Sequence, residues 1–284
     1  MKSNWILNED GSIYHLWLRP GDLSPLIITV GDPDRVTKIL QYFDHVETNI
    51  QSREFKTVTG YLSGKRISVL STGIGTGNID IVMNEVDALF NMNLETGFPL
   101  ENIISLNIIR LGTSGAIQED IPTDSLLITK WSIGMDGLLP FYANGKNGID
   151  LPAELRQRLP GVSKYFVFHA DHKLLEHFQN GVTITGNTLT ASGFYVPQGR
   201  LTRIKQFDLL SGMQNWNIDK IGRIANIEIE TSAIYGLSSL MGHRALSISA
   251  ILANRITGEF SKNSEKTIAK LIEFALEKVS GLAD

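Results

Sequence analysis

The sequence predicts an α/β protein in which helices cover both faces of a mixed sheet. Short apolar runs rich in β-branched residues are typical of strands buried on both sides. In other segments, apolar residues recur at helical spacing and form one stripe. Strand and helix patterns alternate along the chain, which indicates a layered α/β domain. The predicted strands cover 26–30, 67–71, 103–111, 126–128, 224–229 and 245–252, and the main predicted helices cover 80–90, 231–241 and 268–279.

We expect one domain spanning residues 1–284. No internal repeat, low-complexity tract or Pro/Gly/Ser-rich linker divides the sequence. The length suits one large domain and is marginal for two. The ranges 91–102 and 141–161 are rich in Gly, Asn and Pro, which predicts surface loops.

The composition excludes several classes of function. A formal net charge of -4 argues against a nucleic-acid surface, because phosphate backbones attract clustered Lys and Arg. The lack of cysteine removes disulfides, thiolate metal sites and a cysteine nucleophile. The polar start has no apolar signal region, and no apolar run approaches the roughly 20 residues of a membrane helix. We therefore expect a cytoplasmic protein.

The segment after the first predicted strand has features of an anion site. Asp32 followed by Pro33 suits the start of a helix, and Gly31 permits a close approach of the backbone to a ligand. Free N–H groups at a helix start and the guanidinium of Arg35 both suit phosphate. Considered alone, however, the segment is better explained as a capped helix with a surface arginine.

A second arginine strengthens the anion hypothesis. Arg110 ends an apolar run and is followed by a turn that contains Gly112 and Thr113. A partly buried arginine needs an anionic partner, and open α/β sheets bind ligands at the carboxyl ends of their strands. Arg35 and Arg110 could therefore meet over one phosphate, with the Thr113 hydroxyl as a further donor. The alternative is that Arg110 forms a structural salt bridge with an Asp or Glu.

Four segments, taken together, resemble the nucleoside phosphorylase superfamily in its uridine phosphorylase branch. They are Gly-Asp-Pro-Asp-Arg at 31–35, Arg-Glu-Phe at 53–55, Ser-Thr-Gly-Ile-Gly at 71–75 and Ile-Arg-Leu-Gly-Thr-Ser-Gly-Ala-Ile-Gln at 109–118. The resemblance runs in order from about His15 to Arg255. It implies a three-layer α/β/α sandwich around a mixed, partly closed central sheet, with a dimer as the minimal active unit.

The resemblance also implies how phosphate is bound. It places the anion on Gly31, Arg35, Arg110 and Thr113, and it brings Arg53 from the neighbouring subunit. Inorganic phosphate would be a co-substrate, and no cofactor is expected. The assembly would be a homodimer or a hexamer, and the sequence does not separate the two.

A candidate base site lies in the segment 190–200, which contains Phe194, Gln198 and Arg200. A phenyl ring can stack on a flat base, an amide can donate and accept along its edge, and a guanidinium can donate to a carbonyl. Composition alone would favour a polar turn after a strand. The order Phe-Tyr-x-x-Gln-x-Arg, however, resembles the uracil-recognition loop of uridine phosphorylases.

A candidate sugar site lies in the segment 226–230, where Glu228 and Glu230 share one face by the alternation of a strand. Acids at a helix start also have a simple electrostatic explanation. The resemblance assigns Glu230 to the ribose hydroxyls, and Ile229 replaces a methionine that forms an apolar wall beside the sugar. It matches His15 to a histidine that reaches a neighbouring subunit's ribose.

The pair Asn254–Arg255 favours a pyrimidine over a purine. Purine-specific relatives have an aspartate where this chain has Asn254, and an asparagine cannot protonate a purine ring. Arg255 resembles an arginine that assists a uracil carbonyl through water.

Other signals are weaker. The Gly-x-Gly-x-Gly run at 73–77 lacks dinucleotide spacing, and no Gly-x-Ser-x-Gly elbow supports a serine hydrolase. The resemblance allows a monovalent cation near Glu54 and Ile74, but Asn78 replaces the family's serine, so no metal is predicted. A loose group of polar residues has no established zinc spacing and is predicted to lie on a solvated helix: His169, Asp171, His172 and His177.

The sequence thus predicts phosphorolysis of uridine to uracil and α-D-ribose 1-phosphate, with inversion at the sugar. The expected catalytic residues are Arg35, Arg110, Arg200 and Glu230. The alternatives are a purine nucleoside phosphorylase, a nucleosidase that uses water, and a non-catalytic nucleoside-binding protein. Whether thymidine or deoxyuridine is accepted stays open.

Overall fold

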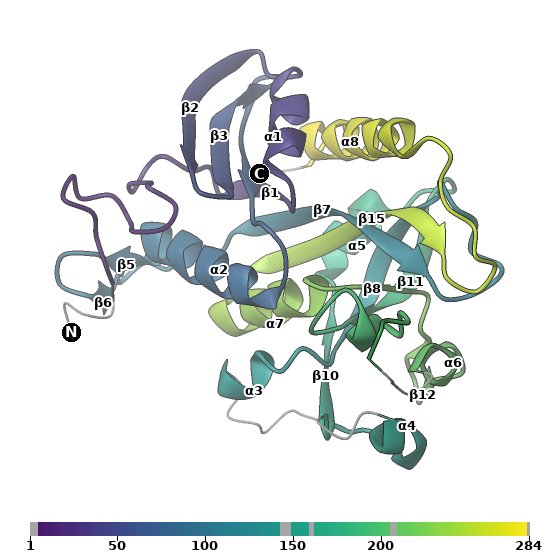
Figure 1. The fold of residues 1–284 in the computed structure, drawn as a ribbon. Helices are drawn as coiled ribbons and strands as arrows, with labels where there is room; N and C mark the ends of the chain where they lie inside the picture. Colours follow the sequence, from purple (N-terminus) through teal and green to yellow (C-terminus); the bar gives the residue numbers. More distant parts are fainter. Residues whose placement is uncertain (1–4, 143–148, 159–161, 205–208, 283–284) are drawn as a thin grey trace.

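A computed structural model of the chain describes residues 5–142, 149–158, 162–204 and 209–282. One sheet of eleven strands forms its centre, and helices cover both faces (Figure 1). The mixed α/β class and the central sheet confirm the fold predicted from the sequence. In the described part of the chain, no helix is long and apolar enough to cross a membrane.

The large sheet has the order β2-β3-β4-β1-β7-β14-β11-β8-β10-β9, and β15 pairs with both β7 and β8. Because β7 and β8 are also joined through β14 and β11, five strands close into a ring. The central sheet is therefore partly closed. The strands are β1 (Leu26–Val30), β2 (His45–Ser52), β3 (Phe55–Leu62), β4 (Lys65–Ser71), β7 (Asn107–Ala116), β8 (Leu126–Gly134), β9 (Ile149–Asp150), β10 (Lys164–His169), β11 (Ile184–Thr190), β14 (Asn226–Glu228) and β15 (Arg244–Asn254).

The helices form two layers on the sheet. Helices α1 (Pro33–Leu40), α5 (His172–Phe178) and α8 (Ser264–Ser280) pack on one face, while α2 (Thr76–Asn91), α7 (Thr231–Met241) and α3 (Leu139–Tyr142) lie together on the other (Figure 1). The short helices α4 (Ala153–Arg158) and α6 (Leu209–Gln214) pack against each other. Two small ribbons complete the chain: β5 (Met92–Asn93) with β6 (Phe98–Pro99), and β12 (Asn217–Ile218) with β13 (Gly222–Arg223).

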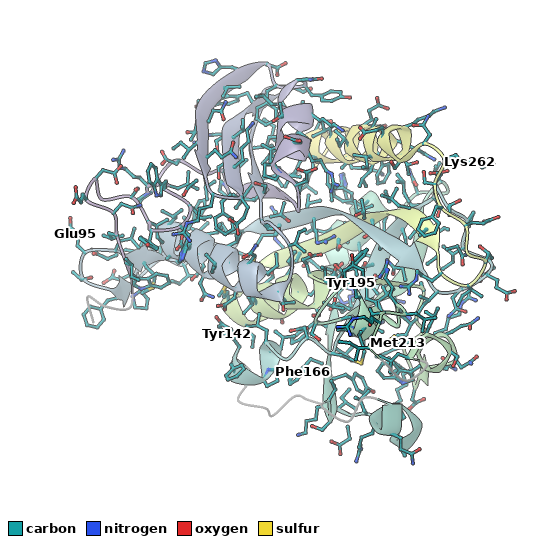
Figure 2. All side chains as sticks on the ribbon, in the orientation of Figure 1. Glu95, Tyr142, Phe166, Tyr195, Met213 and Lys262 are labelled. Carbon is teal, nitrogen blue, oxygen red and sulfur yellow. The ribbon has the colours of Figure 1, made fainter. Side chains whose placement is uncertain are left out.

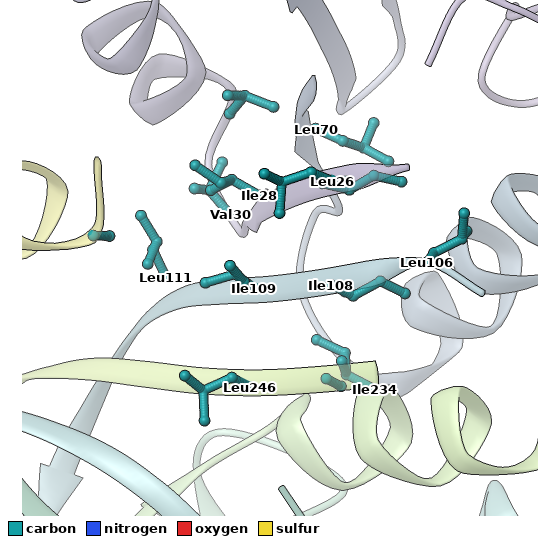
Figure 3. Close-up of a cluster of buried hydrophobic side chains, with 14 of the residues drawn as sticks. Leu26, Ile28, Val30, Leu70, Leu106, Ile108, Ile109, Leu111, Ile234 and Leu246 are labelled. Carbon is teal, nitrogen blue, oxygen red and sulfur yellow. The ribbon is translucent and has the colours of Figure 1, made fainter. Parts of the chain in front are cut away.

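The main core lies between the sheet and these helices. Ile28, Ile109 and Leu246 come from β1, β7 and β15 and lie in one buried cluster with Ile234 of α7 (Figure 3). The three strands run parallel, so their carboxyl ends meet at one edge of the sheet. Burial of this apolar surface, at about 25 cal/mol per Å², holds that edge in place, and the polar residues after each strand are brought together there.

The apolar run 103–111 is only partly a strand, because β7 begins at Asn107. The side chain of Asn91 accepts from the Ile104 N–H at 2.7 Å and donates to the Ile104 carbonyl at 3.1 Å. These bonds hold the Ile104 backbone outside the sheet, and the Ile103 side chain is 55% exposed. The strand prediction was therefore wrong at its start.

Other predicted boundaries also differ. Helix α2 begins four residues before the predicted 80, and the predicted strand 224–229 is limited to β14. The predicted loop 91–102 contains the β5–β6 ribbon, and 141–161 contains β9 and α4, while 143–148 and 159–161 lie outside the described residues. The loop predictions missed these short elements because two-residue strands and a six-residue helix leave no periodicity to detect.

Candidate active site

A cavity of about 790 Å³ opens at the carboxyl ends of β1, β7, β14 and β15. Nine of the residues selected from the sequence line it, which are Gly31, Arg35, Arg110, Thr113, Phe194, Gln198, Arg200, Ile229 and Glu230. The loop that carries Tyr195 lies beside the ends of β7 and β15 and brings the candidate base site to this edge (Figure 2). His15, Arg53 and Arg255 do not line the cavity.

Arg35 is fixed at the start of α1. The Asp32 carboxylate caps the helix by accepting from the Asp34 N–H at 2.9 Å, and Pro33 is the first helical residue. Arg35 is only 8% exposed and donates from Nη1 to the Leu111 carbonyl at 3.0 Å. Burial and the nearby charge of Arg110 lower the pKa of Arg35. Two buried guanidinium groups therefore repel one another at this end of the cavity, and a bound anion would relieve that repulsion.

Arg110 forms a buried ion pair, which was the alternative considered from the sequence. Its Nη2 contacts a carboxylate oxygen of Glu230 and lies 3.3 Å from one of Glu228. Burial opposes the charge of Arg110, but the two carboxylates outweigh it and raise the pKa of Arg110. Nη1 is buried without a hydrogen-bond partner among the described residues. The ion pair thus leaves one donor available beside the cavity.

Glu228 and Glu230 have different environments. Glu228 accepts from the N–H groups of Glu230 and Thr231, each at 2.9 Å, and from the Thr190 hydroxyl at 2.6 Å. Glu230 accepts from the Gly75 N–H at 2.8 Å. Burial raises the pKa of Glu230, and the charge of Arg110 opposes this without reversing it. Glu228 is therefore the anchor of the α7 start, and Glu230 is the carboxylate set at the cavity.

Gly112 lets Arg110 fold back along its own strand. A Cβ atom at this position would overlap Nη1 of Arg110, and it would lie 2.6 Å from Cζ. We expect Gly112→Ala to displace the guanidinium and to lower kcat/KM of the phosphorolysis predicted from the sequence at least tenfold, a smaller effect than losing the group. Steady-state kinetics with varied phosphate measure this. Gly181→Ala is the matched control, because nothing lies within 4 Å of its added Cβ. Equal activity of the two variants would contradict the expectation.

The candidate base residues contact one another. Arg200 donates from Nη1 to the Phe194 carbonyl and to Oε1 of Gln198, both at 2.6 Å. Its guanidinium carbon lies 3.7 Å from the centre of the Phe194 ring. The Phe194 ring is 50% exposed at the cavity. Since Arg200 covers one face of the ring, a base that stacks on Phe194 must use the other face or displace the guanidinium.

Arg255 lies behind this group and does not line the cavity. It donates from Nη2 to the Gln198 carbonyl at 3.0 Å, and its Nη1 is buried without a partner among the described residues. Burial and the charge of Arg200 lower the pKa of Arg255 to about 10. In this structure Arg255 holds the loop that carries Gln198.

The Asn254 amide is used within the fold. It donates to the carbonyls of Gln118 and Ile121 at 2.8 and 2.9 Å. Its oxygen accepts from the N–H groups of Ile256 and Thr257 at 2.9 and 3.1 Å. An aspartate here would place a carboxylate against two carbonyl oxygens. An aspartate at position 254 would therefore disturb the hydrogen bonds of a turn next to the cavity, in addition to supplying an acidic group.

His15 and Arg53 lie outside their own chain's cavity. Nδ1 of His15 is 2.5 Å from the buried Glu85 carboxylate, which also accepts from the Leu16 N–H at 3.0 Å. Arg53 is exposed, has a positive φ of 55°, and its guanidinium lies 5.6 Å from the centre of the Tyr14 ring. Neither residue serves its own chain's cavity in this structure, and the resemblance implies that both reach a neighbouring subunit.

Glu54, Ile74 and Asn78, which were considered as a cation site, also line the cavity. Asn78 donates to a Glu54 carboxylate oxygen at 3.1 Å, and Gly73 and Gly75 have positive φ values of 67° and 89°. His169 ends β10 and its ring stacks on that of His172 at 4.3 Å, so the predicted solvated helix was wrong for His169. His172 and His177 do lie on a helix, α5, which Asp171 caps. Within the described ranges, no group of three or more His, Cys, Asp or Glu residues could hold a metal ion.

Several cavity residues were not selected from the sequence. Ser114 and Gly115 line the cavity and lie in the segment 109–118, which carries the family resemblance. Their place directly after Arg110 and Thr113 could have identified them as cavity residues. Leu252 and Phe260 had no such signal, because an apolar residue at a cavity mouth is indistinguishable from a core residue in a single sequence.

The sequence model of the family described as the Phosphorylase superfamily matches residues 25–280. The chain belongs to this superfamily. A uridine phosphorylase of Thermococcus kodakarensis is 32% identical over 272 residues, which are 95% of this chain and 87% of that protein. A DeoD-type purine nucleoside phosphorylase of Bacillus subtilis is 27% identical over 275 residues, covering 94% and 98%.

The fold is also similar to that of a solved nucleoside phosphorylase structure. The Trypanosoma brucei nucleoside phosphorylase, described as showing uridine phosphorylase activity, has a TM-score of 0.84 and 26% identity. The match covers 98% of this chain and 100% of that one. The family and these similarities show that the chain is an enzyme of the pentosyltransferase class, as the sequence predicted.

Proposed function

We propose that this member of the superfamily is a uridine phosphorylase, which uses inorganic phosphate to cleave uridine into uracil and α-D-ribose 1-phosphate. The observation that carries the proposal is the pair of buried guanidinium groups, Arg35 and Arg110, at the ends of β1 and β7. Glu230 and Glu228 balance the charge of Arg110, but the described residues provide no ion pair for Arg35 and no partner for Nη1 of Arg110. A bound anion would satisfy both groups. Gly31 and Thr113 line the same cavity and would complete the phosphate cage.

In the proposed mechanism, catalysis is electrostatic and forms no covalent enzyme intermediate. Glycosidic bonds break through a transition state with positive charge on the sugar and negative charge on the departing group. Arg200 and Gln198 would stabilise the charge that grows on uracil, with Arg255 supporting Gln198. The phosphate would lie below the anomeric carbon as nucleophile and counter-charge, which inverts the configuration there. Glu230 and Thr113 would hold the ribose beside Ile229.

Three other interpretations of the site are compared with this one. A nucleosidase would use water, and water does not need a cage of arginines. A purine nucleoside phosphorylase is a closer alternative, since relatives of both kinds match the chain at similar identity. The Phe194, Gln198 and Arg200 group favours a pyrimidine, because its amide and guanidinium match the carbonyl and N–H edge of uracil. A non-catalytic binding protein would have no use for the phosphate cage.

One assay separates these possibilities. Release of uracil from uridine is followed with and without phosphate, and inosine is the purine control. We expect release that depends on phosphate and a kcat/KM for uridine at least tenfold above that for inosine. Release without phosphate would support a nucleosidase. A preference for inosine would support a purine nucleoside phosphorylase. No cleavage of either nucleoside would support a binding protein. The same assay with thymidine and deoxyuridine defines the range of accepted sugars and bases.

We also propose that each active site is shared between two copies of the chain, in a dimer or in a ring of three dimers. Arg53 and His15 would come from the neighbour, since neither lines its own cavity. We also propose that the protein is cytoplasmic, as expected from the sequence.

Sharing predicts complementation between inactive variants. Mixing Arg53→Ala with Arg200→Ala during refolding or co-expression would give hybrid dimers in which one site carries both changes and the other carries neither. Random pairing would make about a quarter of all sites wild type, so uridine cleavage should rise well above that of either variant alone. Mixing Arg35→Ala with Arg200→Ala is the control and should restore nothing, because both residues line their own chain's cavity. Equal behaviour of the two mixtures would rule out sharing through Arg53.

A further inference from the structure

A second cavity, of about 660 Å³, lies at the opposite end of the same parallel strands. Leu26, Asn107 and Arg244 line it, and they are at or near the first residues of β1, β7 and β15. The candidate active site lies at the carboxyl ends of these strands, so the two cavities are separated by their length. The β3–β4 turn and the end of α8 form the remaining walls through Tyr61 and Leu282.

Among the described residues, the charged side chains that line this second cavity are all basic. They are Lys65, Arg66 and Arg244, and the described lining contains no aspartate or glutamate. Arg66 is already committed, because its Nε donates to Glu47 at 2.7 Å and its Nη atoms donate to the carbonyls of Leu23 and Gly21, both at 2.9 Å. Lys65 contacts the Leu282 carbonyl. These two residues build the wall of the cavity.

Arg244 differs from its neighbours. Its Nε is buried and has no hydrogen-bond partner among the described residues, which also provide no ion pair for its guanidinium. Asn107 is its register partner on the adjacent parallel strand, and the Oδ1 of Asn107 is likewise buried without a partner. A buried donor on a cation and a buried acceptor, both unpaired, are costly to fold in this state. They lie together on the wall of a cavity large enough for a small metabolite.

We propose that this cavity binds the oxyanion of a small metabolite, with Arg244 as the principal cation and Asn107 as the acceptor for a ligand hydroxyl or N–H. A guanidinium binds carboxylate and phosphate through charge-assisted hydrogen bonds. The aromatic ring of Tyr61 and the side chain of Leu26 offer an apolar surface for the body of such a ligand. The site is independent of the proposed uridine phosphorylase activity.

The test uses the full chain and selenate, a tetrahedral dianion whose selenium can be located by anomalous scattering. Crystals soaked in selenate should show a selenium peak within hydrogen-bonding distance of Arg244, besides any peak between Arg35 and Arg110. Calorimetric titration of the wild type should resolve binding at the Arg244 site at low millimolar selenate, and succinate should compete there if a carboxylate suffices. Succinate that fails to compete would assign the site to tetrahedral anions such as phosphate esters.

Variants decide the assignment. Arg244→Met keeps most of the apolar stem, and it should weaken binding at this cavity at least tenfold while leaving the Arg35–Arg110 peak in place and not lowering the melting temperature. Arg244→Lys keeps the charge and should retain part of the affinity. Arg223→Met removes an exposed arginine outside both cavities and is the matched control.

Three results would overturn the proposal. They are the absence of a peak at Arg244, a peak that survives in Arg244→Met, and a peak in crystals without binding in solution, which means an adventitious ion only. The peak between Arg35 and Arg110 reports separately on the proposed phosphate cage, so the two proposals can fail independently.

Discussion

Replacement of Arg110 by methionine is expected to lower kcat/KM for phosphorolysis on the order of 10²–10³-fold, because it removes a preorganised donor from the proposed phosphate cage. Nη1 of Arg110 is the donor left unpaired beside the cavity, and Nη2 holds Glu230. The loss should therefore affect both phosphate and ribose. Initial rates at varied phosphate and varied uridine measure the two contributions, and both KM values should rise.

The same change should destabilise the fold, because it leaves Glu228 and Glu230 buried without their counter-charge. Breaking a buried ion pair in this way costs about 3–5 kcal/mol. Arg110→Lys separates the two effects, since it keeps a positive charge without the planar fork of a guanidinium. We expect Arg110→Lys to fold normally and still to lose on the order of 10²-fold in kcat/KM. Wild-type rates in Arg110→Lys would show that the guanidinium of Arg110 makes no essential contact with the anion.

The pH dependence of stability provides a further check on Arg110→Met. Burial already raises the pKa of Glu230 in the native protein, and loss of Arg110 should raise it further. A raised folded-state pKa means that the folded chain binds this proton more tightly than the unfolded chain. Stability from the protonated group is full below the unfolded pKa of about 4.3 and is lost as the pH rises through the folded value. The deficit in melting temperature of Arg110→Met relative to wild type should therefore narrow as the pH is lowered from about 7 to about 5.

The sequence predicted the buried part of the fold better than its edges. The predicted strand 26–30 and helix 231–241 match β1 and α7, because both are buried elements with strong, continuous apolar patterns. Strand β2 was missed since it is a largely exposed strand, with the polar sequence His-Val-Glu-Thr-Asn-Ile-Gln-Ser. Its pairing with β3, which no local pattern encodes, decides its structure.

The candidate site was predictable where a residue's type and its place after a strand both pointed to a ligand. Arg35 and Arg110 met both conditions, and the structure brings them to one cavity. The partners of Arg110 were not predictable, because the contact with Glu230 joins residues 120 positions apart. The same holds for Arg255, whose bond to the Gln198 carbonyl depends on how two loops meet. Sequence reasoning identified the chemical groups, and tertiary packing decided which of them face the cavity.

The second large effect is expected at Arg200. Arg200→Ala should lower kcat for uridine phosphorolysis by on the order of 10²-fold, since a donor aimed at the developing negative charge on uracil would be lost. That factor corresponds to about 2.7 kcal/mol of transition-state stabilisation. Arg200 also holds Oε1 of Gln198 at 2.6 Å, so its removal frees the amide to turn. Phe194 would lose the guanidinium that covers one face of its ring.

The kinetic signature distinguishes Arg200 from the phosphate cage. Because Arg200 lies at the candidate base end of the cavity, Arg200→Ala should leave the KM for phosphate near wild type while kcat falls. Arg203→Ala is the matched control, because Arg203 is an exposed arginine three residues further along the same loop and does not line the cavity. It should retain full activity. A uridine with a better leaving group, such as 5-fluorouridine, needs less help at the ring, so it should recover part of the rate in Arg200→Ala. If Arg200→Ala cleaves uridine as fast as Arg203→Ala does, the assignment of the base site is wrong. This outcome would not bear on the proposed phosphate site.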